Sequence, residues 1–216
     1  MPGLIDLGIA MRKAEDDPIW ATRGKAIQAY AALEQALCTL FGHLGSISPI
    51  VAGTIFFKIT SADARSKILE KLFKMKFGTK YNLFLNSFLK QIRPIDKDRN
   101  AIVHWNAMNT VGTDAAGEVT SLVTLKPPAY WGISPEMPMI TAQDLIEFSN
   151  KCEFYTRLWN MFYVVDAGVA KNSAEFDSSP WLNIFEQPIV YPPPIGHPLV
   201  ASVPATNSSQ EFRVQK

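Results

Sequence analysis

Apolar side chains recur every three or four residues over several long stretches of this chain, and this spacing constrains the fold more than any other feature. The most regular stretch runs from Thr141 to about Gly168 and contains Leu145, Phe148, Cys152, Tyr155, Trp159 and Phe162. A period near 3.6 residues places such side chains on one face of an α-helix, where they bury against other helices. The chain is therefore predicted to be mostly all-α.

Caps, glycines and prolines divide the first half of the chain into further helices. Between the first and second of them, 49–58 is predicted only as a short apolar segment. The boundaries are as follows: Asp17 as N-cap and Pro18 begin a helix over about 18–44, Ser61 begins and Gly78 ends the second, Thr79 begins and Pro94 ends the third, and the fourth begins near Asp96.

The pattern changes past Met108. Residues 109–126 are rich in Thr, Val and Gly, with an Asp-Ala-Ala-Gly turn sequence between two short runs, which predicts a β-hairpin inserted into the helical domain. From residue 187 on, six prolines oppose a regular helix. The expected organisation is a helical domain over 1–186 and an extended or disordered proline-rich tail over 187–216.

Composition and motifs exclude several classes of protein. No apolar run reaches the roughly 18–20 residues of a membrane span. The first 30 residues also lack the apolar stretch of a secretory signal, so we expect a cytoplasmic protein without a membrane partner. Cys38 and Cys152 lack the spacing of a zinc site or a disulfide framework, and no glycine-rich phosphate loop is present. Neither a cofactor nor a metal site is expected.

The formal charge of +1 conceals two oppositely charged halves. Residues 1–104 carry 15 basic and 9 acidic residues, whereas residues 105–216 carry 6 and 11. Most of the excess lies in 58–99, with 11 basic and 4 acidic residues, and such a segment can bind a polyanion. The alternative is an ordinary solvated helix face. The candidate RNA contacts are Lys67, Lys71, Lys74, Arg93 and Lys97.

Arg99, Asn100 and His104 form the cluster with recognisable chemistry, and they are expected to open the fourth helix. Asn100 and His104 are four residues apart and share a helix face. A histidine can take a proton from a ribose 2′-hydroxyl or give one to a leaving 5′-oxygen, and an arginine can neutralise the charge of the phosphorane. Helix-start amides would add to phosphate binding. Such a site cleaves RNA without a metal, because the substrate supplies its own nucleophile.

The segment from Arg99 to His104, Arg-Asn-Ala-Ile-Val-His, resembles the Arg-x(4–6)-His motif of the HEPN superfamily, including the polar residue after the arginine. The resemblance extends in helix order over about 18–170, although the hairpin and the tail are not HEPN features. It implies a HEPN-like helical bundle acting as a metal-independent endoribonuclease that leaves a 2′,3′-cyclic phosphate, in a toxin–antitoxin or phage-defence setting. In it, Arg99 and His104 would be catalytic and Asn100 positioning.

Two other interpretations of these residues stay open. His104, followed by Trp105, is equally typical of a core histidine at a capped helix. HEPN-like domains also serve as non-catalytic modules that bind RNA or a protein.

Glu34 falls in the apolar stripe of the first helix, where a buried carboxylate needs a partner. Arg99 and His104 are candidates for that partner, and the alternative is a solvated Glu34 at the rim of the stripe.

A homodimer is the expected assembly, with an antitoxin or regulatory protein as a further candidate partner. One motif supplies a single imidazole, whereas RNA cleavage benefits from both a base and an acid, so a second copy can provide the other. Trp20, Ile102 and Trp105 are the apolar candidates for the interface.

Overall fold

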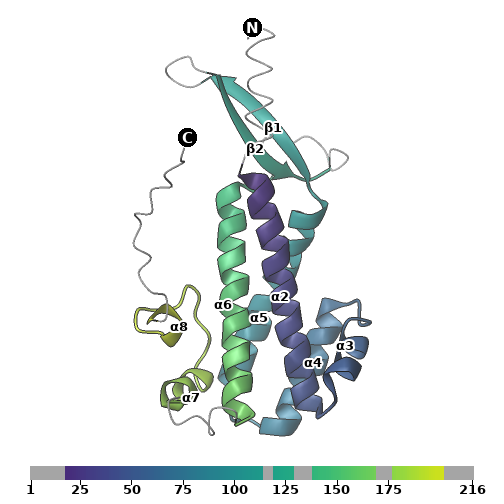
Figure 1. Cartoon of the computed structure of the whole chain (residues 1–216), viewed down its shortest axis with the longest axis vertical. Helices are drawn as coiled ribbons and strands as arrows, with labels where there is room; N and C mark the ends of the chain where they lie inside the picture. The colour runs from purple at the N-terminus through teal and green to yellow at the C-terminus, as the bar shows by residue number, and fades with distance from the viewer. Residues whose placement is uncertain (1–17, 114–118, 129–137, 169–176, 202–216) are drawn as a thin grey trace, which may run out of the picture.

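The computed structural model describes residues 18–113, 119–128, 138–168 and 177–201. Within these ranges the chain forms seven helices and one two-stranded hairpin, which confirms the mostly helical fold class (Figure 1). In chain order the elements are α2 (Ile19–Gly45), α3 (Pro49–Phe56), α4 (Ala62–Phe77), α5 (Asn82–His104), β1 (Asn106–Thr113), β2 (Val119–Lys126), α6 (Ala142–Asp166), α7 (Ser179–Phe185) and α8 (Pro198–Ala201).

Helices α2 and α6 run parallel, side by side, along the long axis of the bundle (Figure 1). Both begin near the hairpin, and their last turns meet at the other end, where His43 Nε2 lies 2.6 Å from Asp166 Oδ2. Helix α5 packs behind this pair, α3 and α4 lie along one edge, and α7 and α8 lie along the other. The hairpin projects from the end at which α2 and α6 begin.

Aromatic side chains dominate the core between these helices. Trp159 of α6 is 1% exposed and sits at the centre. The rings that it contacts come from α4, α5 and α6 itself: Phe73, Phe84, Phe88 and Phe162. The apolar stripe predicted for 141–168 is therefore the interior face of α6.

Several helix ends are set by the residues that the sequence indicated. The hydroxyl groups of Ser61 and Thr141 each accept a hydrogen bond at 3.2 Å from the backbone N–H three residues further on. Gly78 ends α4 with a φ of +60°, a conformation that glycine adopts without steric cost. These three predictions are confirmed. The expected N-cap Asp17 lies outside the described residues, and α2 begins at Ile19.

The prediction of two helices on either side of Pro94 is wrong. Helix α5 continues through this proline as one helix of 23 residues. Pro94 has no N–H, so the carbonyl of Lys90 loses its usual partner in the helix. Both residues are exposed, and water can satisfy that carbonyl. Consequently Arg99 lies in the last two turns of a long helix and not at the start of a short one.

The short apolar segment predicted at 49–58 contains helix α3. Ser48 caps this helix through its side chain, and Pro49 occupies the first turn, where a missing N–H costs nothing. No single helix in the described ranges is long and apolar enough to cross a membrane. Helices α2 and α3 meet the length and composition criteria only as a pair, across a bend of 118°.

Strands β1 and β2 pair antiparallel over 106–113 and 119–126, so the hairpin predicted at 109–126 is confirmed and begins three residues earlier. It follows directly on α5, with only Trp105 between the two elements. The side chains of Val123 and Leu125 are buried, and Leu125 exchanges two backbone hydrogen bonds with Ile140 just before α6. The predicted turn at 114–117 lies outside the described residues.

Residues 187–197 form neither helix nor strand, as their prolines predict, but the segment 187–201 packs on the bundle. Apolar side chains between the prolines pack on α6: the Tyr191 ring lies beside those of Phe154 and Tyr155, and Leu199 is buried. Pro198 begins the four-residue helix α8, because proline is compatible with a first helical position. Residues 202–216 lie outside the described part of the chain.

The attachment of this segment should depend on pH through His197. Its Nδ1 accepts a hydrogen bond from the Leu199 N–H at 3.1 Å, and burial lowers the pKa of His197. A histidine held neutral contributes stability above its unfolded pKa of about 6.5, and this contribution is lost as pH falls through the lower folded pKa. We therefore expect the Leu199 amide to lose protection from hydrogen exchange, relative to its intrinsic rate, as the pH falls below the ordinary histidine pKa of about 6.5. His197→Gln should remove this pH dependence; an unchanged profile in that variant would contradict the assignment.

Candidate active site

Arg99, Asn100 and His104 lie in the last two turns of α5, beside the start of the hairpin. The expectation that they open a short helix is wrong, because α5 does not break at Pro94. Helix-start amides are therefore not available to bind phosphate here. A helix C-terminus carries partial negative charge from its carbonyl groups. Any positive charge that binds phosphate at this position must therefore come from side chains.

Arg23 of α2 provides a cation at this helix end. Its Nε donates a hydrogen bond to the Ile102 carbonyl at 2.9 Å, and its Nη2 donates to the carbonyls of Val103 and Trp105 at 3.0 and 3.1 Å. One guanidinium group thereby satisfies three carbonyls that the end of the helix leaves without intrahelical partners. It also fixes the backbone on both sides of His104. No local motif marks Arg23 in the sequence, because its partners lie about 80 residues away.

Arg99 is held against α2 by an aromatic ring. Its guanidinium carbon lies 5.3 Å from the centre of the Tyr30 ring, within the range of a cation–π interaction. Its Nη1 donates a hydrogen bond to Asn100 Oδ1 at 3.1 Å. The Tyr30 hydroxyl in turn donates to Asp96 Oδ1 at 2.6 Å. Tyr30 and Asn100 thus set the position of Arg99, and Asp96 fixes Tyr30. The sequence indicates Asp96 only as the start of a helix and not as a member of this site.

Burial determines the protonation of Tyr30 and Asp96, the hydrogen-bonded pair next to Arg99. Desolvation, followed by the hydrogen bond to Asp96, raises the pKa of Tyr30 well above its ordinary value. Desolvation also raises the pKa of Asp96, while the hydrogen bond from Tyr30 lowers it. The phenol therefore keeps its proton and remains the donor of the pair.

His104 and Asn100 are both exposed and lie one turn apart on the same side of α5. Among the described residues, the His104 imidazole has no hydrogen-bond or ion-pair partner, and its side chain is exposed. This contradicts the interpretation of His104 as a core histidine. Arg99 is five residues from His104, about 140° around the helix. The structure brings Asn100 and His104 to one face and turns Arg99 toward α2.

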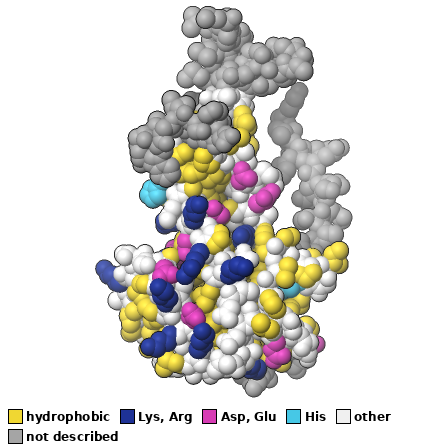
Figure 2. Space-filling model, turned by 180° about the vertical axis from the view of Figure 1, so that it is seen from behind, with side chains coloured by type: hydrophobic (Ala, Val, Ile, Leu, Met, Phe, Trp, Pro, Cys, Tyr) yellow, Lys and Arg dark blue, Asp and Glu magenta, His cyan; other side chains and the backbone are white. Residues whose placement is uncertain are grey.

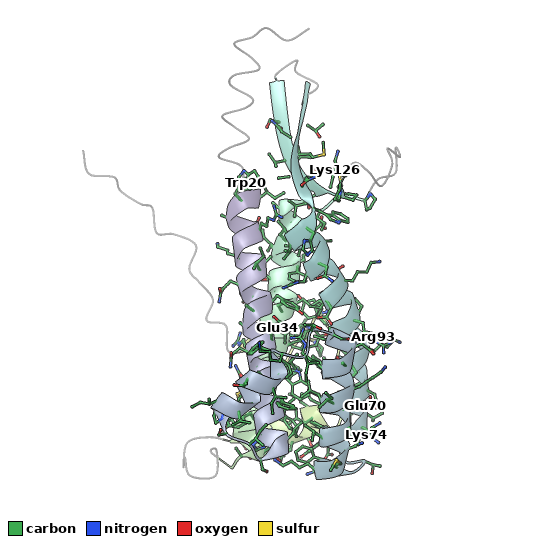
Figure 3. All side chains as sticks on the ribbon, turned by 90° about the vertical axis from the view of Figure 1, so that its right-hand side faces the viewer. Trp20, Glu34, Glu70, Lys74, Arg93 and Lys126 are labelled. Carbon is green, nitrogen blue, oxygen red and sulfur yellow. The ribbon has the colours of Figure 1, made fainter. Side chains whose placement is uncertain are left out.

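The partner of Glu34 is Arg65 of α4, not Arg99 or His104. Arg65 Nη1 lies 2.6 Å from Glu34 Oε1, and the two side chains are only 15% and 21% exposed. Figure 3 shows Glu34 directed from α2 into the bundle. The guanidinium also lies 5.3 Å from the Phe56 ring of α3. Glu34 is therefore a largely buried structural residue, which corrects both the expected partners and the alternative of a solvated rim position.

Removing Arg65 should destabilise the fold through Glu34. Arg65→Met keeps much of the apolar stem but leaves a largely buried carboxylate without its partner, for an expected loss of about 1–3 kcal/mol of unfolding free energy. Glu34→Gln on that background removes the charge and should recover part of the loss. Chemical denaturation of both single variants and the double variant measures the coupling. Strict additivity would contradict an energetic link between the two side chains.

The predicted RNA contacts divide into paired and unpaired cations. Lys67 and Arg93 both pair with Asp63, at 2.7 and 3.0 Å, and Lys74 pairs with Glu70 at 2.6 Å. The hydrogen bond from Lys67 is the largest cause of the lowered pKa of Asp63. Figure 3 shows Arg93, Glu70 and Lys74 on the outer side of the bundle.

Lys71 and Lys97 are exposed and form no ion pair within the described ranges. They are therefore the predicted contacts whose charge is least compensated.

A second polar cluster, which the sequence analysis did not find, lies at the far end of the bundle. Asp166 Oδ2 is 2.6 Å from His43 Nε2 and 3.0 Å from Lys76 Nζ, which joins the last turns of α2, α4 and α6. His43 and Lys76 also line a hollow of about 430 Å³. In the described ranges no three His, Cys, Asp or Glu side chains gather as metal ligands would.

Comparison with known proteins does not assign the chain to a family. The chain matches no protein-family model, no curated protein and no solved structure.

Proposed function

We propose that the end of α5 is the active site of a metal-independent endoribonuclease of the HEPN type. The observation that carries this proposal is the exposure of His104 and Asn100 on one face of α5, one turn apart. Arg99 is joined to this face by its hydrogen bond to Asn100 Oδ1. A toxin–antitoxin or phage-defence role belongs to the same proposal through the resemblance of the motif.

The proposed reaction needs only these side chains and the RNA. His104 accepts the proton of a ribose 2′-hydroxyl, and the 2′-oxygen forms a bond to the adjacent phosphorus. The bond from phosphorus to the 5′-oxygen breaks, and that oxygen takes a proton from an acid. The products are a 2′,3′-cyclic phosphate and a 5′-hydroxyl. Arg99 stabilises the charge of the phosphorane, and Asn100 orients both Arg99 and the phosphate.

A second copy of the chain would supply the acid. A two-fold dimer through the α5 ends places His104 of the second copy opposite the first, one as base and the other as acid. Trp20 is 47% exposed, whereas Ile102 is 2% exposed and already belongs to the core. Trp105 is partly buried against that core.

The deciding experiment is incubation of the purified chain with mixed RNA in the presence of EDTA. Cleavage that survives chelation and leaves cyclic phosphate ends supports the proposed chemistry. Absence of cleavage at any protein concentration contradicts it. Light scattering tests the composite site separately, because a monomer mass for the active protein excludes a partner that supplies the acid.

A non-catalytic HEPN-like module that binds RNA or a protein is the second candidate. One observation favours it: the Arg99 guanidinium is already engaged by Tyr30 and Asn100, as a structural residue would be. Binding of RNA without turnover, with unchanged RNA ends after long incubation, would distinguish this function from catalysis.

A further inference from the structure

Helix α3 is the most exposed apolar segment among the described helices. Only Ala52 and Phe56 of its eight residues are buried. The large apolar side chains on the remaining surface of α3 and at its end are exposed to these extents: Ile50 83%, Val51 46%, Ile55 43% and Phe57 49%. Monomeric proteins rarely expose large contiguous apolar patches, and such a patch commonly marks an interaction site.

These side chains occupy one continuous face. At 100° per residue, the positions from Ile50 to Lys58 that are directed away from the bundle span less than half of the helix circumference. Ala52 and Phe56 point the other way, and Phe56 is fixed by the Phe41 ring of α2 and by Arg65 of α4. The outward face is therefore held rigidly in place by the core.

The charge around this face is positive. No acidic residue occurs in the sequence between Glu34 and Asp63. Lys58 ends the apolar face and is exposed, with no ion pair in the described part of the chain. On the neighbouring α4, Lys71 is likewise exposed and unpaired there. Figure 2 shows many Lys and Arg side chains, with a smaller number of Asp and Glu side chains between them, over the lower half of the molecule. An anionic partner fits this distribution better than a neutral or cationic one.

The size and place of the face favour a lipid surface over a protein. A helix of eight residues is about 12 Å long, whereas a stable protein interface uses about 20–30 residues on each side. The face is also at the outer edge of the bundle, where the opposite side of α3 packs on α2 (Figure 1). A projecting apolar edge flanked by lysines is the arrangement by which peripheral proteins enter the headgroup region of an anionic membrane.

We propose that α3 docks this protein onto an anionic lipid surface. Ile50, Val51 and Phe57 enter the boundary between headgroups and acyl chains, and Lys58 contacts the lipid phosphates. This proposal departs from the expectation, made from the sequence, of a protein without a membrane partner. The helix lies on the membrane and does not cross it, so the bundle stays in water with the end of α5 accessible. The proposal is independent of RNA cleavage.

Vesicle co-sedimentation tests the proposal on the full chain. The wild type should bind vesicles of phosphatidylcholine mixed with phosphatidylserine and bind pure phosphatidylcholine more weakly. Loss of two inserted side chains in the double variant Ile50→Ser with Phe57→Ser should lower the partition coefficient by at least about tenfold. Lys58→Glu should weaken binding to the anionic vesicles alone. Because the substituted side chains are exposed, the thermal midpoint of each variant should stay near that of the wild type.

Leu83→Ser is a control, since Leu83 is 58% exposed at the start of α5 and is not one of the residues of this face. It should bind vesicles like the wild type. Equal binding by the control and the double variant would overturn the proposal, as would a wild type that ignores anionic vesicles. A wild-type dimer that the double variant dissociates in the absence of lipid would assign the face to a second copy instead, which also overturns it.

Discussion

His104→Ala and Arg99→Ala should each lower RNA cleavage by about 10²-fold or more, the scale at which a general base or a charge-stabilising group contributes to catalysis. His104 is exposed and makes no hydrogen bond within the described ranges, so its loss should leave the fold intact. Arg99→Ala removes a cation–π contact with Tyr30, worth about 0.5–2 kcal/mol of unfolding free energy. Initial rates on a labelled RNA, with the denaturation midpoint of each variant, measure both effects.

His197→Gln is the control for the loss of an imidazole, because His197 lies on the edge of the bundle at α8, away from the end of α5. It should cleave RNA like the wild type. Arg99→Lys keeps the charge but loses the planar group that lies over Tyr30, and its rate should fall between those of the wild type and Arg99→Ala. Wild-type rates in both alanine variants would contradict the assignment of the site, even if the protein cleaves RNA.

Trp159→Ala should remove about 3–5 kcal/mol of unfolding free energy, the largest expected effect on stability. The side chain is 1% exposed and contacts aromatic rings from α4, α5 and α6, so its loss opens a cavity where these helices meet. Urea denaturation followed by circular dichroism gives the change in free energy. Leu83→Ala should change it by less than about 0.5 kcal/mol, because Leu83 is exposed.

Trp159→Phe provides a sharper test of the same position. Trp159 Nε1 is buried without a hydrogen-bond partner in the described part of the chain. Phenylalanine keeps an aromatic ring there and removes the unpaired N–H, so part of the cost of the smaller ring should be offset. The phenylalanine variant should be much more stable than the alanine variant. Equal losses in both variants would contradict this expected offset.

Features set by neighbouring residues could be predicted from the sequence, and features set by distant ones could not. Ser61, Gly78 and Thr141 act on the backbone within a few residues, so their identities indicate helix ends directly. Pro94 misled the prediction because its cost depends on the exposure of the Lys90 carbonyl, which the sequence does not show.

The same distinction holds for the candidate site. Arg99, Asn100 and His104 are visible as a motif, and the pairing of Asn100 with His104 on one face follows from helix geometry alone. Arg23 and Tyr30 reach the site only because α2 packs along α5. The partner of Glu34 depends on where α4 lies. The sequence suggested Arg99 and His104, whereas the structure pairs Glu34 with Arg65.

The parallel arrangement of α2 and α6 has a consequence for how the chain folds. Parallel neighbours cannot be joined by a short turn, and nearly a hundred residues separate the end of α2 from the start of α6. Contacts across such a sequence separation carry a loop-closure cost and slow folding. During synthesis, the apolar side of α2 has no α6 to pack against until α6, which ends at Asp166, has left the ribosome. A chain that stops before α6 would expose that side to solvent, and we expect such fragments to aggregate or to require a chaperone.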